Sequence, residues 1–305
     1  MFKTFPQFTK LTLAHKDEYE DFIRNFPPVS EISFTTAMTW WSMFQPISVS
    51  WLNGNLVVAH FILGDEKNTG LSLIGVNDID SSICTIFDYL KERDEPARMV
   101  HVSEFVVHAI AYPELFKFTG ERDYDEYITP VSAMHPLSQA SAASQRKITI
   151  FRKGLHGAKA SLNSIDLSKK TNREILYEHA LGWWQQESQL NRPPRLYIDS
   201  LQMVLANAVF LDVDNICLFT DNNLRGFYLH QLTHDKTYAT VNYYAFDSIK
   251  HGVPEYLLYA SFKELHRQGV GFVNLDFDLG TPFFRTSQLK SSPTNYFRKY
   301  TIEPA

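Results

Sequence analysis

The feature that most constrains this chain is an order of expected elements that occurs twice. In the first half, two helical segments are followed by three β-rich segments, a further helix and a last strand, and the second half repeats this order. The apolar spacing changes between helical and alternating patterns at each step. Three antiparallel strands, a crossover helix and a parallel strand predict an α/β sheet with helices on both faces.

Local signals support this order in both halves. Asn53-Gly54 stands between two β-rich runs, which is a strong hairpin signal because both residues tolerate the positive φ of a tight turn. In the second half, residues 254–269 predict a helix that Gly269 ends as its C-cap. The apolar residues within 270–280 predict the strand that completes the second sheet.

The segment between the halves is basic and rich in Ser and Ala. A helix is expected near residues 137–153, and residues 131–200 hold 10 Lys and Arg against 5 Asp and Glu. This helix is either a surface that meets an anion or a solvated connection. We therefore expect an N-terminal domain over 1–135, a basic connecting helix and linker over 136–165, and a C-terminal domain over 166–305.

Composition excludes several classes of protein. Of the 305 residues, 44% are apolar and 21% are charged, which is the balance of a globular protein rather than a disordered one. No run approaches the roughly 18 apolar residues of a membrane span. Cys84 and Cys217 are too few for a disulfide framework or a Cys-based zinc site, and no metal site is expected. Residues 1–20 contain no apolar signal core, so a cytoplasmic location is expected.

Polar residues gather near the C-terminus. If the strand continues to residue 280, its alternation places Asn274, Asp276 and Asp278 on one face at the carboxyl end. Ligands bind at such ends in open α/β sheets. Gly280 and Arg285 follow closely. These residues predict a charged binding site, and the open alternative is that the aspartates cap the next turn and pair with Arg285.

The same run resembles the C-terminal signature of the lysyl-phosphatidylglycerol synthase C-terminal domain family, which has a tandem GNAT-like fold. The matching residues are Asn274, Asp276, Asp278, Leu279-Gly280, Arg285, Pro293 and Lys299-Tyr300. Upstream, PPVSEISFTTAMTWW, DYDEYITP and QRKITIFRK are also similar to parts of the family. Two positions depart from it: Gln288 stands where the family often has Lys, and Gln145-Arg146-Lys147 stands where it usually has Lys-Arg-Asn.

The resemblance implies transfer of an aminoacyl group from aminoacyl-tRNA to an amine or hydroxyl acceptor. The acceptor would be a lipid headgroup, a peptide or a small molecule, and no cofactor beyond the tRNA donor is implied. Catalytic roles are assigned to Asp276, Asp278 and Arg285, and substrate-binding roles to Asn274, Lys290 and Tyr244. Phosphate contacts to the tRNA are expected from Arg146, Lys147, Arg152 and Lys153.

Two alternatives remain open at this stage. A CoA-dependent N-acyltransferase binds pyrophosphate with a Gln/Arg-x-x-Gly-x-Gly/Ala turn at a helix N-terminus. Residues 247–258 read DSIKHGVPEYLL, where only Gly252 fits this pattern and Pro254 lacks an N–H group, so CoA is disfavoured. The other alternative is a non-catalytic binding protein with the same fold, which the departure at Gln288 leaves open.

Overall fold

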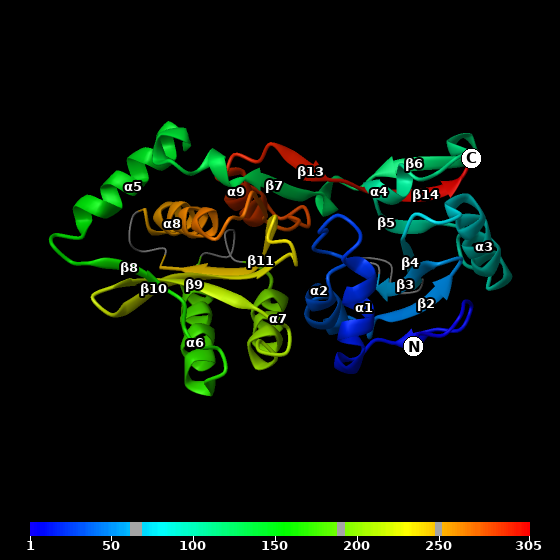
Figure 1. Ribbon diagram of the computed structural model, residues 1–305, viewed down its shortest axis with the longest axis horizontal. Coiled ribbons are helices and arrows are strands. Elements are labelled where there is room, and N and C mark those ends of the chain that lie inside the picture. The colour runs from blue at the N-terminus through cyan, green and yellow to red at the C-terminus, as the bar shows by residue number, and fades with distance from the viewer. Residues whose placement is uncertain (62–68, 188–192, 248–251) are drawn as a thin grey trace. The chain divides into compact units, whose positions relative to one another are not determined.

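The computed structural model describes residues 1–61, 69–187, 193–247 and 252–305 (Figure 1). The chain divides into two compact units, with Met1–Asp125 and Phe297–Ala305 in unit 1 and Glu126–Tyr296 in unit 2. Each unit is a mixed α/β structure. These bounds differ from the expected ones, because residues 126–135 and the basic helix belong to unit 2 and the C-terminal residues return to unit 1.

Unit 2 is built on a seven-stranded sheet. Its strand order is β13 (Asn295–Phe297), β7 (Glu126–Pro130), β12 (Phe272–Asn274), β11 (Tyr238–Phe246), β10 (Asn223–Leu232), β9 (Asp214–Thr220) and β8 (Ala160–Asn163). Strands β9, β10 and β11 are antiparallel, and β12 lies parallel to β11 after a crossover helix, which confirms the predicted α/β pattern. Strand β7 then pairs antiparallel with β12.

Helices cover both faces of this sheet. They are α5 (Ala142–Gly154), α6 (Lys170–Gln186), α7 (Arg195–Ala206), α8 (Val253–Arg267) and α9 (Pro282–Leu289). Helices α6 and α7 lie on one face, and α5 and α8 lie on the other (Figure 1). Gly269 follows the end of α8 at a φ of 89°, the left-handed conformation expected of a residue that ends a helix.

The basic helix α5 is part of unit 2 rather than a solvated connection. It begins at Ala142, later than predicted, because the side chain of Ser141 accepts a hydrogen bond from the backbone N–H of Ser144 and caps the helix. Ile148 and Phe151 are buried, and the Phe151 ring lies 4.5 Å from that of Tyr256 on α8. Its basic residues are exposed, and two of them contact α8: Lys147 pairs with Glu255, and Arg152 lies over the Tyr256 ring.

The prediction of a strand over residues 270–280 is wrong beyond Asn274, where β12 ends. Strand β12 ends there because the Asn274 side chain accepts a hydrogen bond from the backbone N–H of Asp276, which turns the chain. Asp276 has a φ of 68° and Leu279 one of 51°, so neither can continue a strand. Asp276 and Asp278 therefore lie in a loop. The alternation had predicted that they would lie on one face of a strand.

Unit 1 contains two smaller sheets. The first has the order β1 (Thr9–Lys10), β2 (Ser48–Leu52), β3 (Asn55–Phe61) and β4 (Thr69–Ile74), and the second the order β5 (Met99–Ser103), β14 (Lys299–Pro304) and β6 (Phe116–Gly120). Its helices are α1 (Lys16–Ile23), α2 (Phe34–Thr39), α3 (Ile79–Glu92) and α4 (Glu104–Val107). Asn53 and Gly54 have φ of 52° and 76°, which confirms the predicted hairpin turn between β2 and β3.

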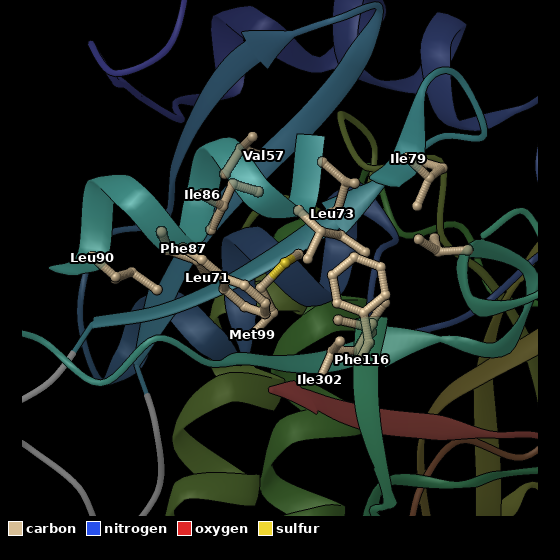
Figure 2. Packing of buried hydrophobic residues seen from close by; sticks show 13 residues of the cluster. Val57, Leu71, Leu73, Ile79, Ile86, Phe87, Leu90, Met99, Phe116 and Ile302 are labelled. Atoms are coloured by element: carbon tan, nitrogen blue, oxygen red, sulfur yellow. The ribbon is translucent and has the colours of Figure 1, made fainter. Parts of the chain in front are cut away.

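Helix α3 contributes five buried residues to a hydrophobic core in unit 1. Its residues Ile79, Ile83, Ile86, Phe87 and Leu90 recur at helical spacing and are all buried. They pack against residues of both sheets, namely Val57, Leu71, Leu73, Met99, Phe116 and Ile302 (Figure 2). Since Ile302 lies on β14, the C-terminal strand is part of the N-terminal core.

This packing predicts that Ile302→Ala destabilises unit 1. Ile302 has no exposed surface, so truncation should lower the free energy of unfolding by about 2–5 kcal/mol through lost burial and a residual cavity. Urea unfolding measures this change. Ile150→Ala is the control, since Ile150 is 45% exposed and its truncation should cost well under 1 kcal/mol. Equal losses for the two variants would contradict the placement of β14.

Candidate functional site

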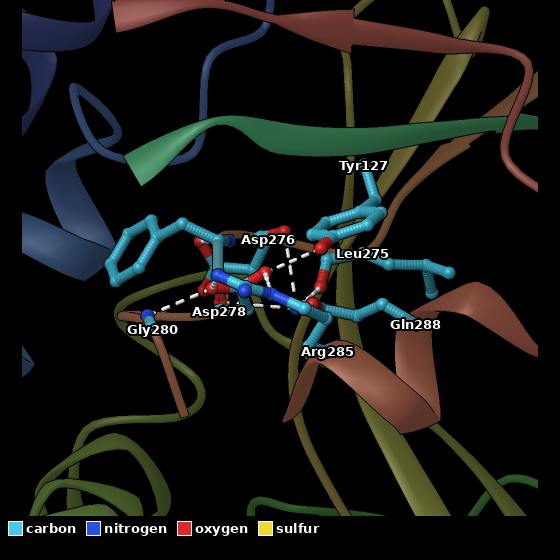
Figure 3. Close-up of polar contacts among 8 residues, drawn as sticks. Tyr127, Leu275, Asp276, Asp278, Gly280, Arg285 and Gln288 are labelled. Atoms are coloured by element: carbon cyan, nitrogen blue, oxygen red, sulfur yellow. Dashed lines mark hydrogen bonds and ion pairs between the residues drawn. The ribbon is translucent and has the colours of Figure 1, made fainter. Parts of the chain in front are cut away.

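The loop after β12 is held by the carboxylate of Asp278, which is fully buried. Arg285 on α9 donates two hydrogen bonds to it, from Nε to Oδ2 at 2.8 Å and from Nη2 to Oδ1 at 2.9 Å. The hydroxyl of Tyr127 donates to Oδ2, and the backbone N–H of Gly280 donates to Oδ1 at 2.8 Å (Figure 3). Both carboxylate oxygens are therefore used within the protein.

These contacts determine the protonation of Asp278. Burial by itself raises the pKa of the carboxyl group, but the hydrogen bonds from Arg285, Tyr127 and Gly280 outweigh burial and leave the pKa below its usual value. A carboxylate held in this way is a poor proton acceptor. Asp278 therefore matches the open alternative from the sequence, in which an aspartate caps the next turn and pairs with Arg285. These contacts fix the loop to α9.

The other polar residues of the signature also brace this loop. The Asn274 side chain is buried and donates to Oε2 of Glu126 at 2.6 Å. The Asp276 carboxylate accepts the backbone N–H of Phe277. The amide nitrogen of Gln288 lies 2.9–3.2 Å from the backbone carbonyls of residues 275, 276 and 277 (Figure 3). Gln288 thus has a role in holding the loop.

A groove of about 740 Å³ lies beside this loop within unit 2. Helix α5 contributes Arg146 and Lys147, α9 contributes Ser287, and Lys290 follows α9. The remaining lining residues are Ala143, Ile150, Glu187, Phe246, Gly252, Pro254, Glu255, Pro282, Phe283 and Thr286. The groove therefore brings together predicted tRNA-binding and substrate-binding residues that are far apart in the sequence.

The remaining predicted residues lie outside this lining. Asp276 and Asp278 lie in the adjacent loop, Arg285 lies on α9, and Lys153 is exposed further along α5. The Arg152 guanidinium lies over the rings of Tyr256 and Tyr259, 5.7 and 5.6 Å from their centroids. Tyr244 is buried, and its ring stacks on that of Phe246, which lines the groove, with centroids 5.9 Å apart.

Sequence reasoning missed Glu255, the central acid of the groove. It lies in the first turn of α8, is only 4% exposed and is an ion-pair partner of both Lys147 and Lys290. An acid after Pro254 resembles an ordinary helix start, where carboxylates favour the N-terminal N–H groups. Its pairing with lysines distant in the sequence is visible only in the fold.

The helices that follow β4 and β11 each have an acid in their first turn. These acids are Asp80 in α3 and Glu255 in α8. In unit 2, a Cβ at Gly252 would lie 2.2 Å from the backbone oxygen of Lys147, so α5 packs directly on this turn. Part of the predicted CoA turn, residues 248–251, lies outside the described residues. In unit 1, the Asp80 carboxylate in the first turn of α3 accepts backbone N–H groups of Ala111 and Tyr112, each at 2.9 Å.

Unit 1 also contains a buried charged cluster that the sequence did not reveal. Nδ1 of His101 lies 2.6 Å from Glu121 and 3.8 Å from Glu31, and Nζ of Lys299 lies 3.5 Å from Glu31. The Tyr124 ring lies 3.9 Å from that of His101. These side chains come from residues 31, 101, 121, 124 and 299, so only the fold assembles them. The cluster ties β14 to β5.

Protonation within this cluster follows from its pairing. Burial lowers the pKa of His101, but the charges of Glu31 and Glu121 outweigh it and leave the pKa raised. Burial raises the pKa of Glu121, but hydrogen bonds and charge from His101 lower it to about 2. We therefore describe the pair as imidazolium and carboxylate.

The described residues contain neither a metal-binding cluster nor a helix that could span a membrane. Outside the undescribed segments, no three His, Cys, Asp or Glu residues are grouped so that they could hold a metal ion. Within the same part of the chain, no helix has both the length and the apolar character required to cross a membrane.

Solved structures resemble the whole chain, although no protein-family model and no curated protein sequence matches it. A conserved protein of unknown function from Bacteroides thetaiotaomicron VPI-5482 is 19% identical over 100% of both chains, with a TM-score of 0.79. The C-terminal domain of a protein named as a lysylphosphatidylglycerol synthetase from Agrobacterium fabrum is 11% identical, with a TM-score of 0.63, and the match covers 95% of this chain and 92% of that one.

A third similar structure comes from an acyltransferase family. An acetyltransferase of the GNAT family from Colwellia psychrerythraea is 8% identical, with a TM-score of 0.52, and the match covers 97% of this chain and 98% of that one. At these identities the comparisons establish the fold. The chain has the tandem GNAT-like fold that the sequence predicted, which it shares with the lysylphosphatidylglycerol synthetase domain.

The buried ion pair predicts a pH-dependent effect of Asp278→Asn. The folded pKa lies below the usual value of 3.8 for the unfolded chain, so the pair stabilises the fold above about pH 3.8 and loses this effect as pH falls through the folded pKa. The variant should unfold about 2–4 kcal/mol more easily at pH 7, with a smaller difference near pH 3. Asp199→Asn, in the exposed pair with Arg195, should change stability by under about 1 kcal/mol. A pH-independent difference for Asp278→Asn would contradict the ion pair.

The cluster in unit 1 predicts a second pH dependence. A raised pKa at His101 stabilises the fold below about pH 6.5 and loses this effect as pH rises through the folded value. The Glu121 contribution is present above the usual Glu pKa of 4.5 and is lost as pH falls through the folded pKa of about 2. His101→Asn should therefore cost more stability near pH 5.5 than near pH 9 in urea unfolding, and Asn tolerates the φ of 54° at this position. A cost that grows with pH would refute a charged His101.

Proposed function

We propose that this chain transfers an aminoacyl group from aminoacyl-tRNA to an amine or hydroxyl acceptor in the groove of unit 2. The observation that carries the proposal is the groove itself, where Arg146 and Lys147 of α5 meet Lys290 beside an aromatic wall formed by Phe246 and Phe283. Lysine and arginine bind phosphates without reading sequence, and aromatic rings stack on unpaired bases. The 3′ end of a charged tRNA offers both kinds of group.

The groove provides cations that are available to a ligand. Arg146 is exposed and has no ion-pair partner among the described residues, and the Lys147 and Lys290 side chains are 52% and 36% exposed. A guanidinium binds a phosphate through two parallel hydrogen bonds, whereas each ammonium acts as a point charge. We assign phosphate binding to these three residues, while Arg152 packs on tyrosines and Lys153 lies outside the groove.

The reaction requires little from the protein because the donor ester is already activated. The acceptor nitrogen or oxygen attacks the ester carbonyl, the bond to the tRNA 3′ oxygen breaks, and the acceptor proton ends on that oxygen. Holding the two reactants together accounts for much of the rate in such transfers. The hydroxyls of Thr286 and Ser287 line the groove and are placed to orient the ester or the acceptor.

We assign positioning roles to the signature residues in place of the catalytic ones expected from the sequence. Asp278 and Arg285 satisfy each other, and their bond fixes the start of α9, which carries Thr286 and Ser287 into the groove and leads to Lys290. Asp276 and Asn274 brace the same loop. Tyr244 supports the aromatic wall from beneath.

Coenzyme A fits this groove less well as a donor. The pyrophosphate of CoA needs free N–H groups at a helix N-terminus, but here Pro254 has none and Glu255 places a carboxylate at that turn. The corresponding turn of unit 1 is occupied by Asp80. These acids would repel a pyrophosphate, and they favour an aminoacyl ester.

A transfer assay tests the proposal. The wild-type protein is incubated with a mixture of labelled aminoacyl-tRNAs and cell extract, and label is followed into lipid, peptide and small-molecule fractions. We expect transfer by the wild type and a loss of about tenfold or more for Arg146→Ala and Lys290→Ala, because each removes a phosphate contact.

Lys263→Ala is the matched control, since Lys263 is exposed on α8 outside the groove and its removal should leave transfer unchanged. Label that enters products only from acyl-CoA would refute the proposal. So would transfer that is insensitive to both groove variants. Transfer that is reduced equally by Lys263→Ala would show a non-specific effect of charge and would also remove the groove assignment.

A further inference from the structure

Glu255 is a buried carboxylate that is only half used by the protein. Nζ of Lys147 lies 2.9 Å from its Oε1, and Nζ of Lys290 lies 3.7 Å from the same oxygen. Oε2 accepts no hydrogen bond from the described residues, and Glu255 lines the groove. A side chain that is 96% buried therefore keeps one oxygen without a hydrogen bond at the lining of the groove.

The surroundings of this oxygen select for a cation. A carboxylate oxygen accepts hydrogen bonds and donates none, so an ammonium group satisfies it and a phosphate oxygen does not. The two lysines hold the carboxylate in place through Oε1 without using Oε2.

We propose that Glu255 sets the donor specificity of the groove by binding the free amino group of the aminoacyl ester through Oε2 and by repelling pyrophosphate. This inference rests on the proposed function and names the feature of the donor that is recognised. An aminoacyl ester carries an ammonium beside its reactive carbonyl, whereas an acyl-CoA lacks this ammonium and brings a pyrophosphate. One carboxylate therefore discriminates between the two donor classes in both directions.

The lysines complete this discrimination. An ammonium bound at Oε2 places the ester next to Lys147 and Lys290, which remain available for a single phosphate of the RNA backbone. Arg146, across the same groove, adds a further cation. Recognition of the amino group also explains why α5 can close on Gly252, since no pyrophosphate has to be accommodated at that turn.

Two probes with opposite charge test the inference by equilibrium binding, without any transfer reaction. The first is a stable 3′-aminoacylamino-adenosine, used with its amino group free or acetylated, and the second is inorganic pyrophosphate. The wild type should bind the free amine at least about tenfold more tightly than the acetylated form. Glu255→Gln should lose this preference and gain at least about tenfold in affinity for pyrophosphate.

A structural defect cannot produce these two opposite shifts together. Glu255→Met, which keeps the length of the side chain without a polar tip, is the second variant if Glu255→Gln does not fold. Glu264→Gln is the control on the same helix, because Glu264 pairs with Arg267 away from the groove. It should behave like the wild type.

Each outcome is decisive. Equal affinity of the wild type for the free and acetylated probes would overturn the inference, and so would Glu255 variants that gain no affinity for pyrophosphate. If binding behaves as expected but no aminoacyl transfer occurs, the proposed function fails while the role of Glu255 as an amine-binding carboxylate stands. If transfer occurs without amine discrimination, the inference fails and the proposed function stands.

Discussion

The carboxylate of Asp278 is the interaction on which the candidate site depends. It is fully buried and accepts hydrogen bonds from Arg285, Tyr127 and Gly280, which belong to α9, β7 and the loop itself. Because one end of α9 is fixed in this way, Ser287 and Lys290 reach the groove at defined positions. We therefore propose that the signature residues anchor this loop and that the groove beside them carries the ligand-facing groups.

Much of the fold could be predicted because it depends on local patterns. The Asn53-Gly54 hairpin, the Gly269 helix end and the antiparallel β9–β11 strands followed by α8 and a parallel strand all follow from short-range sequence signals. The strands that leave their own half could not be predicted this way. Strand β14 completes a sheet of unit 1, and β7 joins the sheet of unit 2, through pairings that are distant in the sequence.

The candidate site was predicted in part for the same physical reason. Arg146, Lys147 and Lys290 could be chosen by charge and motif, and the structure brings them to one groove. The turn at Asp276 was missed because an Asn side chain that caps a backbone N–H is compatible with either a strand or a loop. Glu255 and the His101 cluster were missed because their partners come from distant segments, and charge pairing of that kind leaves no local pattern.

Acids at the start of helices give the two units a common character. Glu255 lies in the first turn of α8 and Asp80 in the first turn of α3. A phosphate-binding helix would present free N–H groups at these turns. In unit 2 the acid also lines the groove. The chain shares its fold with acyltransferases, and we propose that the acid in the groove favours a donor that carries an amino group over CoA.

The most direct measurement is an experimental structure of the complete chain with a non-hydrolysable aminoacyl-adenosine bound. The account predicts that the adenosine lies in the groove of unit 2 against Phe283, with its amino group within hydrogen-bond distance of Glu255. Density for the ligand elsewhere on the chain, or in the groove with its amino group turned away from Glu255, would contradict it.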